Sequence, residues 1–412
     1  MPMLYFYLLI LAIDFYLFQG IKTLTATFSS ETQRTLVHWA FWGVHIAFAA
    51  FIFYAMTTFD REKGMKTTQS LAFNALVLVM IPKLVFAFVL LGQDAVRLLA
   101  TLPNYAFGQP NTEGSYMPER RAFISQLGLG LAAIPFAGII YGILKGKYDY
   151  TVYNHTLYFK DLPDVFDGFT ITQLSDIHAG SFDNPEAVKR GVALANAQKS
   201  DILFFTGDLV NNSAEEIEPY LAIFGALQAP FGKFSIFGNH DYGDYKPWRS
   251  VEAKMANLQK LKAHHKDLGF RLLLDENVEI ERNGQKLTLI GIENWGQGFA
   301  QYGDLSRAMT GVAPDSFKIL LSHDPTHWEK QVKTLPNTIH LTLSGHTHGA
   351  QMGVEIKGFK WSPIKYRYPK WAGLYEENGR YLHINRGFGF LAFSGRVGIP
   401  PEISVLTLRK AI

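Results

Sequence analysis

The chain has 412 residues, of which 39 are basic and 36 acidic, so its formal net charge is +3. A net charge this small does not produce the strong positive field that is typical of a nucleic-acid-binding protein. The chain has no cysteine, so it cannot form disulfides, thiolate metal sites or cysteine nucleophiles. The charges are unevenly distributed, since residues 1–146 hold only 10 of the basic and 7 of the acidic side chains. We therefore expect an apolar first third, followed by a soluble part with no net charge.

Four apolar segments lie in the first third, at positions 2–21, 35–59, 71–91 and 122–144. A helix rises about 1.5 Å per residue, so each segment can cross a hydrocarbon core of about 30 Å. The second and fourth are uncharged, whereas Asp14 interrupts the first and Lys83 the third. For these two, a buried helix of a soluble core is the rival interpretation. We predict a four-helix transmembrane region over residues 1–146, and hence a multi-pass protein of the cell membrane.

Asp14 and Lys83 are the charged residues inside these segments. An isolated charge within a bilayer is costly, so one expectation is that both side chains face the interior of the bundle and pair. The alternative is that each lies near the membrane–water interface, where a long side chain can reach the headgroups.

The rest of the chain, after a short linker at 146–150, alternates strand-like and helical patterns. Runs rich in Ile, Leu, Phe, Val and Thr predict strands at 168–175, 202–206, 234–237, 286–290, 317–321, 338–343, 381–385 and 402–408. Apolar residues at helical spacing predict helices at 184–199, 213–228 and 251–268, and Ser213 with Glu216 forms a capping-box pattern. These patterns predict one layered α/β or α+β domain over residues 151–412.

Polar residues follow five of the predicted strands, and they include seven metal-ligand side chains: Asp176, His178, Asp208, Asn239, His323, His346 and His348. In layered α/β folds, sites form at the carboxyl ends of strands. In Asp-x-His and His-x-His units, alternation along a strand would turn both side chains to one face. Seven ligands serve two metals if one carboxylate bridges. Imidazole with carboxylate suits Zn, Fe or Mn, so we expect two divalent ions of this kind.

The charges of such a site indicate its substrate. Two divalent ions bring +4, Asp176 and Asp208 return −2, and a hydroxide leaves about +1, which attracts a phosphate ester. His240, next to Asn239, could donate a proton to the leaving oxygen. Arg386 could clamp a phosphate oxygen or form a structural salt bridge.

The blocks SDIH, TGDLV, GNHD, LSHDP and SGHTHGAQ together resemble the calcineurin-like metallophosphoesterase family over about residues 151–412. The resemblance implies an αββα sandwich with a dinuclear centre, which is a metal-dependent phosphoric ester hydrolase. It implies that the first metal takes Asp176, His178, Asp208 and His348, and that the second takes Asp208, Asn239, His323 and His346. Asp208 would bridge the metals, and His240 would act near the leaving group.

The sequence is most similar to the bacterial membrane-anchored branch of this family, with LPDVFDGFTITQLSDIH at 162–178 and the late GLY, NRG and PEI blocks. Two departures are Ala350, where Gly is commoner, and Asn211, where Ser/Thr phosphatases carry an Asp that orients the catalytic His. The second departure disfavours a protein phosphatase, although Asn211 could still accept a hydrogen bond from His240.

We therefore predict a membrane-bound phosphodiesterase or pyrophosphatase whose partners are the lipid bilayer and a phosphoester, with no nucleic acid. The resemblance raises lipid-linked substrates such as UDP-2,3-diacylglucosamine. The rival functions are a nucleotide phosphodiesterase or nuclease, and a non-catalytic membrane sensor of phosphate ligands.

Residues 359–371, which follow the GHTHG loop in the chain, mix aromatic and basic side chains. Trp and Tyr favour the headgroup region and Lys and Arg favour anionic lipids, so this segment could lie at the membrane interface. The alternative is a loop that packs its rings on the domain. Asp241 and Asp324 are expected to support the site rather than bind metal, and His264, His265 and His327 to be ordinary solvated residues.

Overall fold

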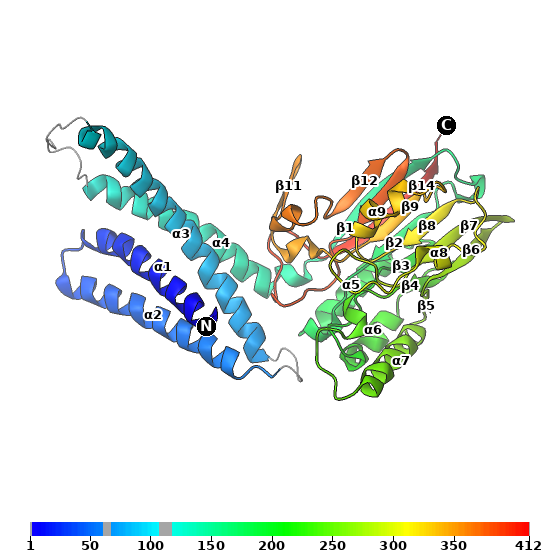
Figure 1. Cartoon of the computed structure of the whole chain (residues 1–412), viewed down its shortest axis with the longest axis horizontal. Helices are drawn as coiled ribbons and strands as arrows, with labels where there is room; N and C mark the ends of the chain where they lie inside the picture. Colours follow the sequence, from blue (N-terminus) through cyan, green and yellow to red (C-terminus); the bar gives the residue numbers. More distant parts are fainter. Residues whose placement is uncertain (1, 61–66, 107–117, 412) are drawn as a thin grey trace. The chain divides into compact units, whose positions relative to one another are not determined.

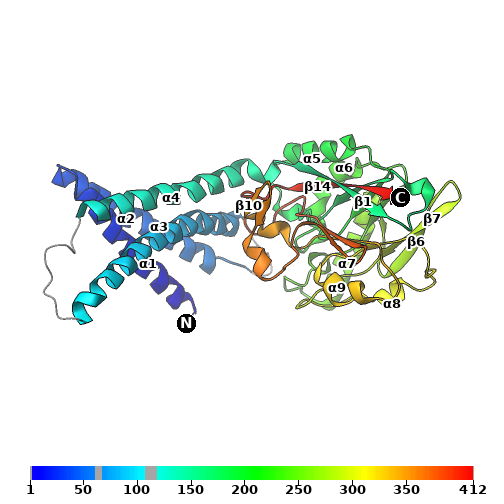
Figure 2. The ribbon, with the colours of Figure 1, turned by 90° about the horizontal axis from the view of Figure 1, so that it is seen from above.

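The computed structural model describes residues 2–60, 67–106 and 118–411. Backbone contacts divide the chain into two compact units, and the boundary between them lies between Tyr141 and Gly142 (Figures 1 and 2). The first unit is helical, and the second contains the sheets. Each unit is described by itself.

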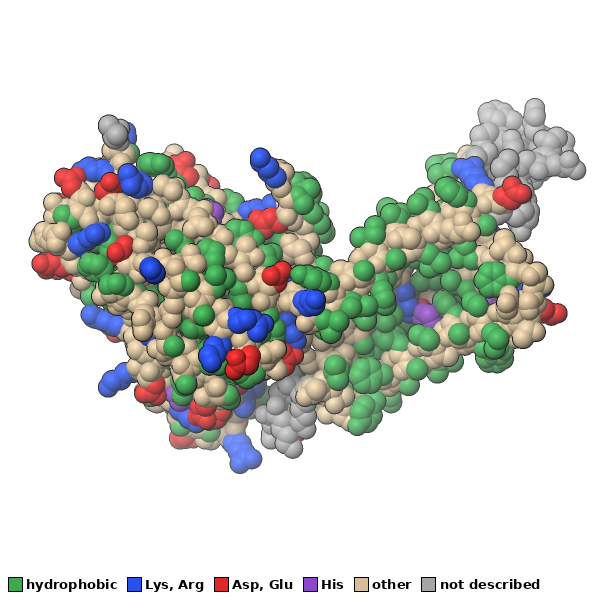
Figure 3. Space-filling model, turned by 180° about the vertical axis from the view of Figure 1, so that it is seen from behind, with side chains coloured by type: hydrophobic (Ala, Val, Ile, Leu, Met, Phe, Trp, Pro, Cys, Tyr) green, Lys and Arg blue, Asp and Glu red, His purple; other side chains and the backbone are tan. Residues whose placement is uncertain are grey.

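The helical unit contains α1 (Pro2–Thr25), α2 (Glu31–Thr57), α3 (Thr67–Ala106) and α4 (Pro118–Leu144). Each of these four helices is long and apolar enough to cross a membrane. In Figure 3 this unit shows many hydrophobic and few charged side chains, whereas charged side chains are more numerous on the other unit. The four predicted transmembrane helices are confirmed. With 40 residues, α3 extends well beyond the predicted segment 71–91.

A buried ionic cluster joins three helices of this unit. Lys83 Nζ of α3 lies 2.7 Å from Asp14 Oδ1 of α1, and His45 Nε2 of α2 lies 3.5 Å from the same oxygen. Asp14 is 3% and Lys83 7% exposed. The expectation that these two residues face inward and pair is therefore confirmed, and placement at the interface is not found.

The second unit is built on two six-stranded sheets. The first sheet has the order β1 (Thr151–Phe159), β14 (Glu402–Lys410), β2 (Thr170–Leu174), β3 (Ile202–Phe205), β4 (Lys233–Ser235) and β5 (Arg271–Leu272). The second has the order β12 (Gly373–Glu377), β13 (Arg380–Ile384), β9 (Leu341–Ser344), β8 (Lys318–Leu321), β7 (Gln285–Gly291) and β6 (Glu276–Arg282). The central neighbours β2–β3–β4 and β7–β8–β9 pair in parallel, so their carboxyl ends share an edge in each sheet.

Three apolar cores show how these layers stack. One core holds residues of both sheets, such as Phe204 of β3 and Ile319 of β8, and therefore lies between them. A second core packs α5 (Pro185–Ala197), α6 (Leu221–Gly225) and α7 (Val251–Asp267) on the first sheet. A third packs α8 (Leu305–Ala308) and α9 (Thr326–Lys330) on the second sheet (Figure 2). The αββα sandwich is confirmed, and strands buried on both faces explain the nearly continuous apolar runs.

One predicted helix forms differently. Residues 213–228 begin as a 3₁₀ helix, Ala214–Tyr220, and only Leu221–Gly225 is α-helical. Pro219 lies inside the 3₁₀ segment. Proline lacks the N–H that an α-helix would use at this position, which disfavours an α-helix there. The capping box is present, with the Glu216 carboxylate accepting a hydrogen bond from the Ser213 N–H at 3.1 Å.

Candidate metal centre

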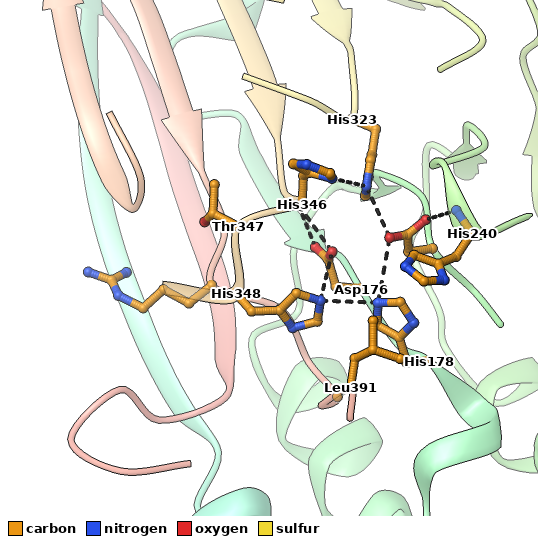
Figure 4. A network of polar contacts seen from close by, with 12 residues as sticks. Asp176, His178, His240, His323, His346, Thr347, His348 and Leu391 are labelled. Atoms are coloured by element: carbon orange, nitrogen blue, oxygen red, sulfur yellow. Dashed lines mark hydrogen bonds and ion pairs between the residues drawn. The ribbon is translucent and has the colours of Figure 1, made fainter. Parts of the chain in front are cut away.

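All seven predicted ligand residues lie in loops that follow the parallel strands of the two sheets. Asp176 and His178 follow β2, Asp208 follows β3, and Asn239 follows β4 in the first sheet. In the second sheet, His323 follows β8, and His346 and His348 follow β9. The structure brings these side chains together beyond the carboxyl ends of these strands, where the ligand residues labelled in Figure 4 point toward one another.

Backbone conformation, rather than strand alternation, aims these side chains. Asp176, His178, Asp208, His346 and His348 all have positive φ, between 48° and 72°. The sequence argument from alternation in Asp-x-His and His-x-His is therefore wrong, because β2 and β9 end before these residues. A side chain in the left-handed region is strained, and such strain is typical of functional sites.

The first group of possible ligands contains Asp176, His178 and His348, all buried. His348 Nε2 lies 3.2 Å from Asp176 Oδ1 and 3.0 Å from His178 Nε2. Three ligand atoms of these residues lie within 4.8 Å of one another, a spacing that could hold one metal ion. The Asp176 carboxylate also accepts a hydrogen bond from the His346 N–H, which links this group to the second.

The second group contains Asp208, His323 and His346. His323 Nε2 lies 3.1 Å from Asp208 Oδ2 and 3.3 Å from His346 Nδ1. Asn239 joins this group, since its Oδ1 lies 2.8 Å from His346 Nδ1. Two His/Asp groups that could hold metal are therefore adjacent in one centre.

Asp208 lies between the two groups. Its Oδ2 is 3.1 Å from His323 Nε2 in the second group and 3.5 Å from His178 Nε2 in the first. The donor set fits divalent cations well: imidazole nitrogens approach one another to 3.0–3.3 Å beside two buried carboxylates. A metal cation can accept the lone pairs of several converging nitrogen and oxygen atoms at once, whereas a proton can be shared by only two such atoms.

Hydrogen bonds outside the cluster fix the orientation of its members. His323 Nδ1 donates to the Thr206 carbonyl at 2.7 Å, which turns Nε2 into the centre. The Asp241 carboxylate accepts from the backbone N–H groups of Asp208, Leu209, Val210 and Gly238, and so shapes the loop that carries Asp208. The Asp324 Oδ2 lies 3.5 Å from His346 Nε2. Both carboxylates therefore support the centre from outside, as the sequence predicts.

The electrostatics of the centre favour cations. Burial alone would raise the pKa of the Asp208 carboxyl, but the adjacent His323 and His240 hold that pKa below its usual range. Burial alone would lower the pKa of His323, but the Asp208 carboxylate outweighs it and raises the pKa to about 10. The Asp208 carboxyl thus favours its ionised form, which attracts a cation, either the protonated His323 ring or a metal ion.

His240 lies at the rim of the cluster. Its backbone N–H donates to Asp208 Oδ1 at 2.8 Å, and its ring stands 4.9 Å from that of His178. Its Nδ1 donates to the backbone carbonyl of Asn211 at 2.8 Å. Asn211 does orient this histidine, but through the main chain, while its side chain bonds Ser181 instead. Nε2 of His240 is the ring nitrogen left for other partners.

Three aromatic residues of the centre are absent from the sequence predictions. The Tyr368 hydroxyl lies 2.9 Å from His346 Nε2, the Asn239 amide donates to the Tyr245 hydroxyl at 2.8 Å, and Phe299 meets the His346 ring edge-on at 4.9 Å. A lone aromatic residue carries no sequence signal for such a contact. Tyr368 does fall within the aromatic and basic segment 359–371.

Arg386, by contrast, is not available to a substrate. Its guanidinium is buried and pairs with Glu402 at 2.5 Å and with Glu355 at 2.6 Å. Of the two roles considered for it, the structural salt bridge is confirmed. The neighbouring Arg396 is also buried and donates to the backbone carbonyls of Arg386, Gly387 and Gly389.

Tyr368→Phe is expected to weaken metal binding about 10- to 100-fold, because the imidazole of His346, a predicted ligand, loses the partner that fixes its orientation. The measurement is activity on a soluble aryl phosphodiester against metal concentration, with kcat at saturating metal nearly unchanged. Tyr366→Phe is the matched control, since Tyr366 is 78% exposed. A fall of kcat at unchanged metal affinity would instead assign Tyr368 to the substrate.

Two family models match parts of this chain. Residues 1–147 match the family model described as a probable calcineurin-like phosphoesterase transmembrane domain, and residues 169–350 match the calcineurin-like phosphoesterase model. The uncharacterized metallophosphoesterase YkuE of Bacillus subtilis is 30% identical over 259 residues, which cover 62% of this chain and 84% of YkuE.

Two vertebrate proteins, each described as a transmembrane protein with metallophosphoesterase domain, are also similar. The one from Bos taurus is 27% identical over 61% of this chain and 55% of its own length. The one from Danio rerio is 26% identical over 74% of this chain and 70% of its own length. The chain therefore belongs to the calcineurin-like metallophosphoesterases, phosphoester hydrolases that use divalent metals, and it is a multi-pass membrane member of that family.

Proposed function

We propose that this protein is a two-metal phosphodiesterase or pyrophosphatase that acts on lipid-linked phosphoesters at the membrane. One observation carries the proposal: the Asp208 carboxylate lies between two groups of histidine and carboxylate ligands, in a chain with four candidate membrane spans. We assign Mn, Fe or Zn as the two ions, since these metals accept imidazole and carboxylate together.

The proposed ligand assignment gives each ion four protein ligands. Asp176, His178, Asp208 and His348 hold the first ion, and Asp208, Asn239, His323 and His346 hold the second. When bound, two such ions would polarise a phosphoryl group and lower the pKa of a nearby water molecule. The chain supplies the orientation of the ligands through Thr206, Asp324 and Tyr368.

His240 is proposed as the catalytic residue that assists the leaving group. The Asn211 carbonyl holds its Nδ1–H, so Nε2 can present a proton to the oxygen that departs from phosphorus. A positioned acid of this kind matters most for an alkyl or sugar oxygen, which leaves poorly without a proton.

The membrane region supports the choice of substrate. We propose that residues 1–146 anchor the chain and that residues 151–412 form the catalytic domain, which then works beside lipid headgroups. A diacylated nucleotide sugar such as UDP-2,3-diacylglucosamine combines a lipid anchor with a pyrophosphate and is one candidate. The equal numbers of basic and acidic residues after position 146 argue against a nuclease, which needs a positive field along its groove.

The test is hydrolysis by the full-length chain in mixed lipid–detergent micelles, followed by phosphorus NMR. The protein is supplied with Mn, Fe or Zn and offered UDP-2,3-diacylglucosamine, a glycerophospholipid, a dinucleotide and bis(p-nitrophenyl) phosphate. We expect metal-dependent cleavage that is faster for a lipid-borne ester than for the dinucleotide. Faster cleavage of the dinucleotide, or no cleavage with any metal, would contradict the proposal.

A further inference from the structure

A small hairpin projects from the metallophosphoesterase unit, where β11 is labelled in Figure 1. Its strands are β10 (Val354–Ile356) and β11 (Phe359–Trp361), joined by Lys357 and Gly358. Gly358 has φ of +83°, a conformation that suits glycine in a two-residue turn. The register pairs Val354 with Trp361, Glu355 with Lys360, and Ile356 with Phe359.

This register separates the side chains into two faces. Directly opposed residues of an antiparallel pair share a face, and positions two apart along a strand share it too. One face therefore carries Glu355 and Lys360, and the other carries Val354, Ile356, Phe359 and Trp361. The hairpin is amphipathic, with a face that is wholly apolar.

The polar face is the one that packs on the protein. Glu355 pairs with the buried Arg386 at 2.6 Å, and Lys360 Nζ donates to the Ala372 carbonyl. The apolar face points outward: Ile356 is 65%, Phe359 53% and Val354 44% exposed. Figure 3 shows hydrophobic side chains together on one flank of this projecting element. This orientation is the reverse of an ordinary surface hairpin, and an exposed apolar patch of this kind marks an interaction site.

The surroundings of the apolar face are basic and aromatic. Lys357 lies in the turn, and Lys365, Tyr366 and Arg367 are exposed in the following segment. Residues 352–375 contain five basic side chains and one acidic side chain, Glu355, which is already paired with Arg386. Aromatic and aliphatic side chains beside Lys and Arg form the composition that anionic membrane interfaces favour.

We propose that the apolar face of the β10–β11 hairpin docks into the headgroup region of an anionic lipid bilayer. Three observations favour a bilayer, rather than a protein, as the partner of this face. The chain spans the membrane, so a bilayer is always within reach, and only six residues, 145–150, separate α4 from β1. Four apolar side chains are far fewer than the roughly 20–30 residues that each partner brings to a stable protein interface. The exposed cations would repel those of a second copy.

The residues that follow the hairpin connect it to the loop that carries His346 and His348. The Ser362 hydroxyl, next to Trp361, donates to the Gly349 carbonyl of the His346–His348 loop at 2.7 Å. Farther along, the Tyr368 hydroxyl lies 2.9 Å from His346 Nε2, and the Thr347 hydroxyl donates to the Trp371 carbonyl at 2.6 Å. Hairpin and ligand loop are thus held together, so docking would present the centre to an ester in the lipid surface. This last step rests on the proposed function.

The docking itself is tested by fluorescence on the full-length chain in nanodiscs. The protein has no native cysteine, so Lys357→Cys carries a single environment-sensitive dye at the hairpin turn. Asn283→Cys, in the exposed turn between β6 and β7, carries the same dye as a matched control. In discs that contain anionic lipid with a nitroxide on the acyl chain, we expect at least about twofold quenching at position 357 and little at 283.

Substitutions then identify the face. Ile356→Ser with Phe359→Ser, made in the Lys357→Cys chain, is expected to abolish the quenching. Val251→Ser with Met255→Ser, exposed apolar residues of α7, should leave it intact. An unquenched dye at position 357 in the otherwise unchanged chain would overturn the proposal. Excimer emission from pyrene at the same position, without quenching by lipid, would assign the face to a second copy and overturn it as well.

Hydrolysis separates this inference from the proposed function. The Ile356→Ser/Phe359→Ser chain should cleave a lipid-borne ester in vesicles several-fold more slowly, and bis(p-nitrophenyl) phosphate at the unchanged rate. Equal rates on the lipid ester would contradict the coupling between hairpin and centre. If the unsubstituted chain cleaves no lipid ester, the proposed function fails, while the quenching still decides whether the hairpin docks.

Discussion

Asp208→Asn is expected to lower hydrolysis of bis(p-nitrophenyl) phosphate about a thousandfold or more, which corresponds to about 4 kcal/mol of transition-state stabilisation. The reason is that Asp208 Oδ2 faces both ligand groups, at 3.1 Å from His323 Nε2 and 3.5 Å from His178 Nε2. An amide has nearly the same shape, but it lacks the charge that holds two cations close together. The measurement is kcat/KM for the purified full-length chain with metal in excess.

The control for this substitution is Asp315→Asn, which makes the same chemical change at an exposed position. It should keep full activity. Folding of the Asp208→Asn chain is checked by its thermal unfolding in detergent. We expect it to fold, because the Asn amide can occupy the space of the carboxylate. A folded Asp208→Asn protein with undiminished activity would refute the central position of this residue.

Lys83→Met is expected to destabilise the helical unit by about 3–5 kcal/mol, because it leaves the buried Asp14 carboxylate without its counter-charge. Lys83 Nζ lies 2.7 Å from Asp14 Oδ1, and both side chains are less than a tenth exposed. Asp14 is 3% exposed, so solvent cannot readily replace this contact. The measurement is unfolding of the full-length chain in mixed micelles by titration with a denaturing detergent.

The double variant Asp14→Asn/Lys83→Met is the informative companion. It removes both charges at once, so it should recover most of the stability that Lys83→Met loses. If Lys83→Met alone unfolds at the same detergent concentration as the unsubstituted protein, the ion pair does not stabilise the bundle. His45, at 3.5 Å from Asp14, would be the group to examine next.

The sequence predicts the architecture well where composition alone decides it. Uncharged runs such as 35–59 fit a helix in lipid, and apolar runs such as Ile202–Phe205 become strands buried on both faces. The ordered polar blocks after these strands also predict which side chains meet, because parallel strands bring their carboxyl ends to one edge. These features are visible in short stretches of sequence, so they can be predicted without knowledge of the tertiary structure.

Other features depend on tertiary structure and have no local pattern. β1 is polar along much of its length and forms only by pairing with β14, 251 positions farther along the chain at Thr151 and Glu402. The sequence predicts His264, His265 and His327 to be solvated, and this is wrong, because all three are buried. His265 and His327 each form a hydrogen bond with a serine hydroxyl, at 2.8 and 2.9 Å. The serine partners lie in other elements or turns, so no spacing in the sequence indicates them.

The direction in which the ligand side chains point likewise depends on tertiary structure. Alternation along a strand predicts convergence for Asp176 with His178, but the side chains converge because both residues adopt positive φ after the strand has ended. Only the packing of loops from two sheets can maintain this conformation. Tyr368 escapes prediction for the same reason, since its contact with His346 exists only once segment 359–371 has folded back on the ligand loop.

Elemental analysis of the purified full-length protein, paired with activity on the same samples, tests the central claim most directly. We expect about two divalent transition-metal ions per chain, loss of activity when a chelator removes them, and recovery when Mn, Fe or Zn is returned. The Asp208→Asn chain should retain at most about one ion. A fully active protein that contains no such metal would contradict the account.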